Sequence, residues 1–140
     1  MKVFLDTNVL VAAFATRGLC ADVLRTVLAE HELILGEVVL TELRTVLSKK
    51  FKLPPERIQA AEAVFEGTPV VPKPAKPSQL EIGDRADRWV LANAEASGAE
   101  ILVTGDADLL SVARAATIRI ASPRAFWELL RSGRRVPRAP

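Results

Sequence analysis

The stretch Ile101-Leu102-Val103-Thr104-Gly105-Asp106-Ala107-Asp108-Leu109-Leu110 decides the fold of this chain. Its first four residues are apolar or β-branched, which predicts a short buried strand over 101–104. Gly105 permits a sharp exit from that strand, and the Asp-x-Asp-Leu-Leu sequence that follows is typical of a helix start with acids near its positive end. We interpret the stretch as a strand that delivers carboxylates to its carboxyl end.

The first residues of the chain repeat this arrangement. Residues 2–5 form a brief apolar run, and Asp6-Thr7-Asn8 interrupts it. In open α/β sheets, ligands bind at the carboxyl ends of the strands. If the two strands are neighbours, their acids converge, and convergent carboxylates indicate a site for a divalent cation.

Composition limits the class of protein. With 140 residues, of which 49% are hydrophobic, the chain has material for one sizeable core and is expected to form one domain. Cys20 is the single cysteine, which excludes an internal disulfide, and His31 is the single histidine, which argues against sites built on imidazole. Since no apolar run approaches the roughly 18 residues of a membrane span, we expect a soluble, unprocessed, cytoplasmic protein with no membrane association.

Apolar spacing along the rest of the chain alternates between strand-like and helix-like runs. Strands are expected over 2–5, 32–36, 70–71, 101–104 and 117–121. Helices are expected from Asn8 as N-cap, over 19–30 and 37–50, from Pro54 to Gly67, over 84–97 and 108–115, and after the cap Ser122-Pro123. Strands that alternate with helices predict a central parallel sheet covered on both faces, which is a three-layer α/β/α sandwich.

Glu42 is the most informative side chain outside the two strand ends. It lies one turn from Val38 and Val46 on its expected helix, so it falls on or beside the buried face. A buried glutamate is costly without a partner. Two interpretations remain: Glu42 joins the acids of the strand ends, or it lies at the edge of the apolar stripe and pairs with Lys49 or Arg25.

Asp87 and Asp84 compete for one place on a later helix. Asp87 shares a face with Val90 and Leu91, which directs it inward near the helix start, and Asp84 lies one turn earlier on roughly the same face. We favour Asp87 as the functional acid because the apolar stripe flanks it, which would leave Asp84 as a helix cap. The opposite assignment stays open.

The expected cluster consists of Asp6, Glu42, Asp87 and Asp106. At roughly 4 Å and an effective dielectric constant of ~20, each pair of like charges costs about 4 kcal/mol, so several carboxylates cannot all stay ionised without a cation. Oxygen ligands without histidine or cysteine suit Mg²⁺ or Mn²⁺ and argue against zinc. With these acids set aside, the rest of the chain is more basic than its formal net charge of +2, which suits a polyanionic substrate.

Three segments resemble the motifs of a known family. VFLDTNVLVAAF, VVLTELRTVL and DRADRWVLANAEASGAEILVTGDADLL are similar, in this order and spacing, to the motifs of PIN domains. The resemblance covers about residues 1–130. Within the family, the motifs are most similar to those of the small prokaryotic PIN proteins described as toxins of type II toxin-antitoxin modules. It implies a metal-dependent endoribonuclease with a central parallel sheet, in which three or four acids hold Mg²⁺ or Mn²⁺.

The resemblance also implies roles for individual residues. The catalytic and metal-binding positions of the family fall on Asp6, Glu42, Asp87 and Asp106. Possible supporting positions fall on Asn8, Asp84, Thr104 and Asp108. The implied reaction is metal-assisted hydrolysis of RNA phosphodiester bonds, and the implied partners are an antitoxin protein and a second copy of the chain. Because Arg85-Ala86 stands where relatives often have more acids, the choice of the third acid stays open.

The expected organisation is a PIN-like nuclease domain over 1–130 and a basic tail over 131–140. The tail carries four arginines that could touch phosphate, although a solvated, frayed tail is the favoured interpretation.

Two other functions compete with the nuclease. The first is a non-catalytic PIN-fold module that binds RNA or protein. The second is a haloacid-dehalogenase-like phosphatase, in which Asp6 would be the covalent nucleophile. The phosphatase would need a second acid at position 8, where this chain has Asn8. It would also need a lysine near the later acids, and the sequence has no candidate there.

Overall fold

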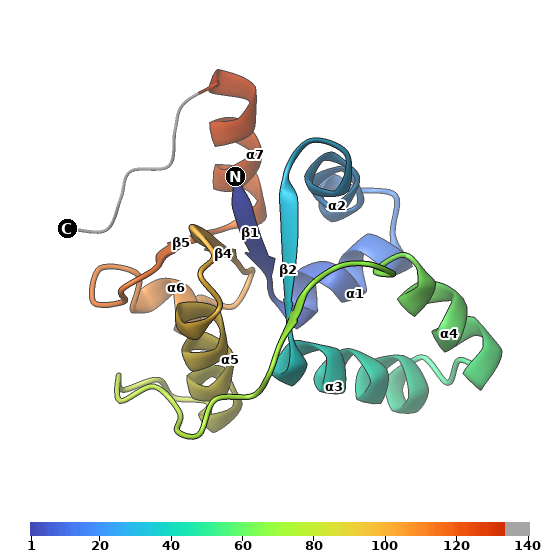
Figure 1. The fold of residues 1–140 in the computed structure, drawn as a ribbon, viewed down its shortest axis with the longest axis horizontal. Helices are drawn as coiled ribbons and strands as arrows, with labels where there is room; N and C mark the ends of the chain where they lie inside the picture. The colour runs from blue at the N-terminus through green and yellow to red at the C-terminus, as the bar shows by residue number, and fades with distance from the viewer. Residues whose placement is uncertain (134–140) are drawn as a thin grey trace.

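The computed structural model describes residues 1–133 and contains a five-stranded parallel sheet (Figure 1). The strands are β1 (Lys2–Leu5), β2 (Glu32–Gly36), β3 (Val70–Val71), β4 (Ile101–Val103) and β5 (Arg119–Ala121). They lie in the order β3-β2-β1-β4-β5. The short strand β3 is at an edge, as the prolines on either side of it predict, because proline cannot donate to a ladder.

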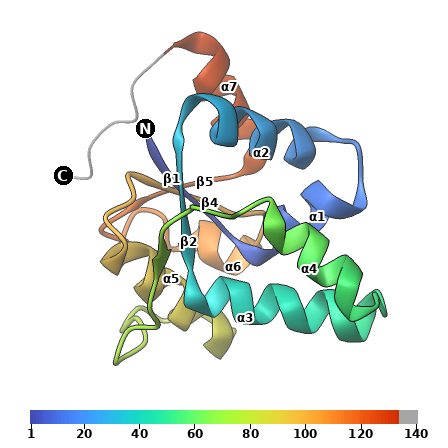
Figure 2. The ribbon, with the colours of Figure 1, turned by 45° about the vertical axis from the view of Figure 1, so that its right-hand side comes forward.

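Seven α-helices connect the strands within the described residues. They are α1 (Thr7–Ala15), α2 (Leu19–Glu30), α3 (Glu37–Thr45), α4 (Pro55–Ala63), α5 (Arg85–Ala96), α6 (Ala107–Ser111) and α7 (Pro123–Ser132). Helices α2 and α7 lie together on one face of the sheet, and α5 and α6 lie on the other (Figures 1 and 2). The molecule therefore has the three-layer α/β/α architecture that the sequence predicts.

The two central strands form the middle of the core. Residues Val3–Leu5 of β1 and Ile101–Val103 of β4 have no exposed surface. A strand between two layers of helices is covered on both faces, which explains why these runs are continuously apolar rather than alternating.

The strand order fixes where the ends of β1 and β4 meet. From β1 the chain builds outward to β2 and β3 on one side, and to β4 and β5 on the other. The connections that leave β1 and β4 therefore diverge, and open sheets form their ligand crevice at such a point. Asp6 follows β1 and residues 104–106 follow β4, so both acidic strand ends lie at this crevice.

The start of α1 differs from the prediction. Asp6, rather than Asn8, caps the helix, because its carboxylate accepts a hydrogen bond of 2.7 Å from Thr7 N. Asn8 Oδ1 instead accepts a hydrogen bond of 3.1 Å from Gly105 N. Aspartate and asparagine are equally good caps, so the local pattern does not distinguish them, and the contact with the loop after β4 decides.

Helix α6 also differs from the prediction of a helix over 108–115. The Asp106 carboxylate accepts hydrogen bonds from Asp108 N and Leu109 N and so sets the first turn one residue earlier. The helix ends at Ser111.

Other elements also have different limits from those predicted, and α4, predicted from Pro54 to Gly67, ends at Ala63. Strand β5 is shorter than 117–121, because Thr117 uses its backbone N–H and its hydroxyl to hydrogen-bond the Glu95 carboxylate. The helix expected over 37–50 divides into α3 and a π-helical turn at Val46–Lys50.

The last helix continues into the segment predicted to be a tail. Ser122 Oγ caps α7 by accepting a hydrogen bond of 3.1 Å from Ala125 N, and the helix ends before Gly133, which has a φ of 69°. Residues 134–140 lie outside the described residues. Within residues 1–133, no helix is long and apolar enough to cross a bilayer alone, and α1 and α2 reach that length only as a pair bent by 105°.

Candidate metal centre

Asp6 is held in place by hydrogen bonds to both of its carboxylate oxygens. It is 4% exposed, and its Oδ1 accepts from Thr7 N at 2.7 Å. Its Oδ2 accepts from Thr104 Oγ1 at 2.7 Å. Thr104 is fully buried, and its hydroxyl also accepts a hydrogen bond of 3.0 Å from Asp106 N. One threonine thus ties together the acidic ends of β1 and β4.

Asp106 belongs to a group of three neighbouring acids. Asp87, Asp106 and Asp108 each place one carboxylate oxygen within 4.8 Å of the others. Asp87 belongs to the first turn of α5, Asp106 caps α6, and Asp108 lies in the first turn of α6. The positive ends of these two helices reduce the cost of bringing the acids together.

The structure places Asp84 and Asp87 in different environments. Asp87 is 7% exposed, and within residues 1–133 its Oδ2 has no hydrogen-bond partner. Asp84 is exposed, and its Oδ1 caps α5 by accepting a hydrogen bond of 2.8 Å from Ala86 N. Asp84 still lies close enough to act electrostatically on Glu42 and Asp87. Asp87 is therefore a buried acid with an unpaired oxygen in the described part of the chain, whereas Asp84 is an exposed helix cap.

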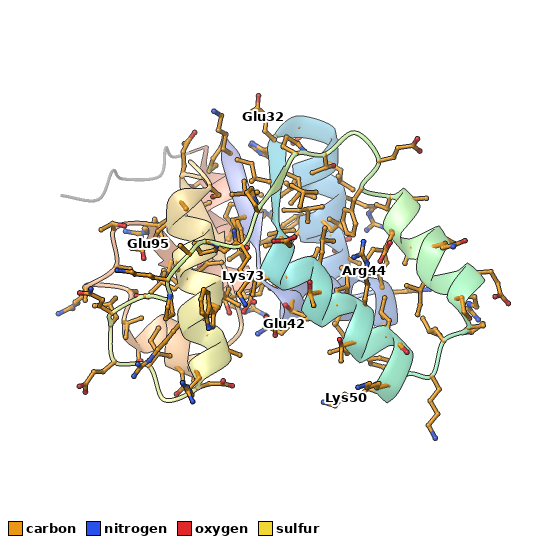
Figure 3. All side chains as sticks on the ribbon, turned by 60° about the horizontal axis from the view of Figure 1, so that its bottom comes forward. Glu32, Glu42, Arg44, Lys50, Lys73 and Glu95 are labelled. Atoms are coloured by element: carbon orange, nitrogen blue, oxygen red, sulfur yellow. The ribbon has the colours of Figure 1, made fainter. Side chains whose placement is uncertain are left out.

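Glu42 lies on α3 where that helix approaches α5 (Figure 3). Its Oε1 is buried and has no hydrogen-bond partner in the described part of the chain. The alternative pairing with Arg25 or Lys49 is not seen. Arg25 pairs with Asp22 instead, and no ion pair within residues 1–133 includes Lys49.

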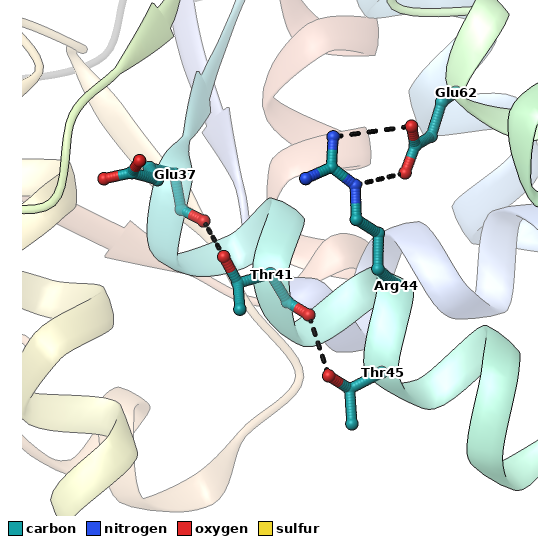
Figure 4. Close-up of polar contacts among 5 residues, drawn as sticks. All are labelled: Glu37, Thr41, Arg44, Thr45 and Glu62. Carbon is teal, nitrogen blue, oxygen red and sulfur yellow. Dashed lines mark hydrogen bonds and ion pairs between the residues drawn. The ribbon is translucent and has the colours of Figure 1, made fainter.

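Helix α3 makes further polar contacts (Figure 4). Arg44 Nε lies 2.5 Å from Glu62 Oε1 of α4, and Arg44 Nη2 donates to the second carboxylate oxygen at 3.4 Å. Thr41 Oγ1 donates to Glu37 O and Thr45 Oγ1 donates to Thr41 O, each at 3.0 Å. The arginine of α3 therefore faces α4 and supplies no countercharge to the acids that face α5.

Burial and mutual repulsion favour the neutral forms of these acids. Burial, followed by the negative charge of Asp6, raises the pKa of Glu42 to about 7. Burial, followed by the negative charge of Asp106, raises the pKa of Asp87 to about 7. Burial also raises the pKa of Asp6, although the hydrogen bond from Thr104 opposes this effect. Near neutral pH Asp6, Glu42 and Asp87 therefore either hold protons or are stabilised by a bound cation.

The donor set fits a hard divalent cation. The acids offer oxygen ligands alone, and neither Cys20 nor His31 belongs to the group of three acids within 4.8 Å. Buried carboxylate oxygens without partners, on Glu42 and Asp87, are costly in a protein interior. Carboxylate ligation of this kind suits Mg²⁺ or Mn²⁺ rather than zinc.

Asn93 has a role that the sequence pattern does not reveal. This fully buried residue of α5 accepts a hydrogen bond of 3.1 Å from Val38 N at the start of α3. Its Nδ2 donates to Val71 O at 3.4 Å and to Pro72 O at 3.2 Å. Gly36 leaves room for it, because a Cβ there would lie 2.3 Å from Asn93 Oδ1. In the sequence, the only indication of this role is an asparagine on the apolar face of a helix. Through these hydrogen bonds, Asn93 joins the two helices that carry Glu42 and Asp87.

Comparison with known proteins supports this architecture. The PIN domain family model matches residues 2–108. The chain is similar to VapBC2 from Rickettsia felis, solved with a DNA fragment from its promoter, with 21% identity and a TM-score of 0.63 over 87% of this chain and 98% of that chain. It is also similar to VapBC-1 from nontypeable Haemophilus influenzae, with 17% identity and a TM-score of 0.59 over 89% and 99% of the two chains.

A further likeness is to the PIN domain endonuclease Utp24, with 20% identity and a TM-score of 0.50 over 86% of this chain and 84% of that chain. No curated protein sequence matches the chain. At these low identities the solved structures show a shared fold. The family match covers the strand ends β1 and β4 and the helices α3 and α5 that surround the acids, and on this evidence the chain belongs to the PIN domain family.

Proposed function

We propose that this protein is a metal-dependent endoribonuclease. The observation that carries the proposal is a pair of buried carboxylate oxygens, on Glu42 and Asp87, that have no hydrogen-bond partner within residues 1–133. They lie near Asp6 and Asp106, at the point where the strand order reverses. Such oxygens are costly unless a cation takes them. Mg²⁺ or Mn²⁺ would be held by these four acids.

The side chains of the centre orient one another. When bound, the metal would supply Lewis-acid stabilisation of the phosphate and lower the pKa of water. Thr104 fixes Asp6 through the hydrogen bond to Oδ2, and the backbone N–H groups of α6 fix Asp106. Asn8 Oδ1 holds the loop after β4 through Gly105 N. Asp84, at the start of α5, would add negative charge at the rim, and Asp108, whose carboxylate lies within 4.8 Å of those of Asp87 and Asp106, would offer a further oxygen ligand.

The likeness to VapBC toxin-antitoxin PIN proteins supports a more specific proposal. This chain would be the toxin component of a type II toxin-antitoxin module, with an antitoxin protein as its partner. RNA as the substrate, a homodimer and a cytoplasmic location are proposed on the family resemblance. The nuclease domain would span 1–130, with the basic segment 131–140 as an addition.

Cleavage of single-stranded RNA by the purified protein tests the proposal. We expect Mn²⁺ or Mg²⁺ to support cleavage, EDTA to abolish it, and Asp6→Asn to lack it. Asp22→Asn, which alters an exposed acid of α2 paired with Arg25, is the matched control and should cleave normally. DNA of the same sequence tests whether the substrate must be RNA.

Two outcomes would overturn the proposal. RNA binding without cleavage under any divalent cation would identify a non-catalytic module. Release of inorganic phosphate from a phosphomonoester, with intact RNA, would identify the phosphatase. The residue at position 8 argues against the phosphatase, because Asn8 has an amide where that chemistry wants a carboxylate.

A further inference from the structure

A pocket of about 440 Å³ lies beside the acids, between α3 and α5. Glu37, Thr41 and Glu42 line it from α3, Trp89 lines it from α5, and Lys73 lines it from the connector after β3. Glu42 belongs both to this pocket and to the acid cluster, so the pocket opens directly next to the candidate metal centre. Its volume falls within the range of about 300–1,000 Å³ that is typical of small-molecule sites.

Lys73 and Trp89 form a contact across the pocket. Lys73 Nζ lies 4.3 Å from the centroid of the Trp89 ring, and in Figure 3 Lys73 projects between α5 and α3. No carboxylate of residues 1–133 forms an ion pair with this ammonium. The backbone is anchored nearby, because Lys73 N donates to Glu37 Oε1 at 2.7 Å and Asn93 Nδ2 donates to Pro72 O at 3.2 Å. An ammonium group that forms no ion pair within residues 1–133 therefore shares this pocket with the carboxylates of Glu37 and Glu42.

The remaining lining of the pocket suits a flat aromatic group. Ala86 and Trp89 are one helical turn apart on α5, and Val38 faces them from α3. These side chains leave an apolar slot one wall of which is an indole ring. Indole rings bind nucleobases by stacking, and this stacking tolerates every base.

We propose that this Lys73–Trp89 pocket binds one nucleotide of single-stranded RNA next to the phosphate that is cut. The base would stack on Trp89, and the Lys73 ammonium would leave the ring to pair with the phosphate of that nucleotide. The pocket would therefore set affinity and register rather than sequence. This inference rests on the proposed nuclease function and deepens it by naming where the RNA flanking the cleavage point lies.

Binding without cleavage tests the pocket. The parent protein carries Asp6→Asn and Trp127→Phe and is kept in EDTA, so that cleavage cannot interfere and Trp89 is the sole tryptophan. The probe is a short oligoadenylate. We expect the probe to quench Trp89 fluorescence. Trp89→Leu, whose affinity is measured by filter binding, should bind the probe about tenfold or more weakly.

Lys73 gives a second readout that a structural role would not move. Lys73→Met should weaken binding and make the negative slope of log affinity against log salt concentration shallower by about 0.7, as the loss of one phosphate contact predicts for a single strand. Lys73→Arg should keep the slope. Lys76→Met is the matched control, because Lys76 is exposed on the same connector and does not line the pocket.

Several results would overturn the pocket as an RNA site. These are unchanged affinity in both Trp89→Leu and Lys73→Met, an equal effect of Lys76→Met, or no binding by the parent. If Trp89→Leu unfolds, the affinity for the probe is measured instead in Trp89→Phe, which keeps an aromatic ring, and in Lys73→Met. Cleavage by the wild-type protein with Mn²⁺ is measured separately. Cleavage with an unchanged KM in both pocket variants would reject the pocket and leave the nuclease in place, whereas absent wild-type cleavage would reject the nuclease.

Discussion

Thr104 Oγ1 donates a hydrogen bond of 2.7 Å to Asp6 Oδ2, and both residues are buried although 98 positions separate them. This bond joins the ends of the two central strands. It also leaves Asp6 with a fixed orientation, because the other oxygen accepts from Thr7 N. Asp6 is thus fixed at the carboxyl end of the two central strands.

Replacement of this hydroxyl should destabilise the protein. Thr104→Val keeps the shape of the side chain but leaves a buried oxygen of Asp6 without its donor, which costs about 1–3 kcal/mol. Thr104→Ser keeps the donor and should lose much less. Urea unfolding in EDTA measures both variants. Equal stability of the valine and serine variants would show that the bond contributes nothing.

Metal should stabilise the folded protein. A ligand that binds the folded state alone adds about 2.7 kcal/mol at one hundred times its dissociation constant, so Mg²⁺ or Mn²⁺ should raise Tm by several degrees. Asp106→Asn should respond less, while its metal-free form should be at least as stable as wild type. Asparagine can still cap α6, and one repulsive charge is gone. A less stable metal-free variant with an unchanged metal response would show that Asp106 is only a helix cap.

The metal-free protein should lose stability as the pH rises. Glu42 and Asp87 have a pKa of about 7 in the folded chain, against ordinary values of 4.5 and 3.8. Between about pH 4 and pH 7 the folded chain therefore holds protons that the unfolded chain has released, and the free energy of unfolding falls across this window. Denaturation in EDTA at a series of pH values measures the fall. Glu42→Gln should flatten it and Glu56→Gln, on the surface of α4, should not.

The two acids of α5 should differ in catalysis. Asp87→Asn should lose most cleavage, because Asp87 is buried with an unpartnered oxygen, whereas Asp84→Asn should stay within about tenfold, or roughly 1.4 kcal/mol. Both variants should fold, since a cap contributes only ~1 kcal/mol. Single-turnover cleavage at saturating Mn²⁺ measures the difference. Loss of activity in Asp84→Asn with retention in Asp87→Asn would assign the third acid to Asp84, one helical turn earlier.

Much of the fold could be predicted because local and global signals agree. The runs at 3–5 and 101–103 are continuously apolar, as strands between two helix layers must be, and an acid follows each within three residues. The placement of Asp87 toward the interior follows from helical spacing alone.

The features that could not be predicted depend on contacts between distant segments. The cap of α1 is Asp6 rather than Asn8 because Gly105 takes the asparagine side chain. The buried Asn93 links α3, α5 and the connector, and nothing in its neighbouring residues indicates those partners. The Lys73–Trp89 contact likewise joins a loop to a helix.

The pairing of β1 with β4 also governs when the cluster can form during synthesis. Asp6 leaves the ribosome about a hundred residues before its partners Thr104 and Asp106. At about 5–20 residues per second, that interval lasts several seconds. A nascent chain that ends before Asp87 therefore carries only Asp6 and Glu42 of the four acids, and the cluster cannot assemble until residue 106 has been translated.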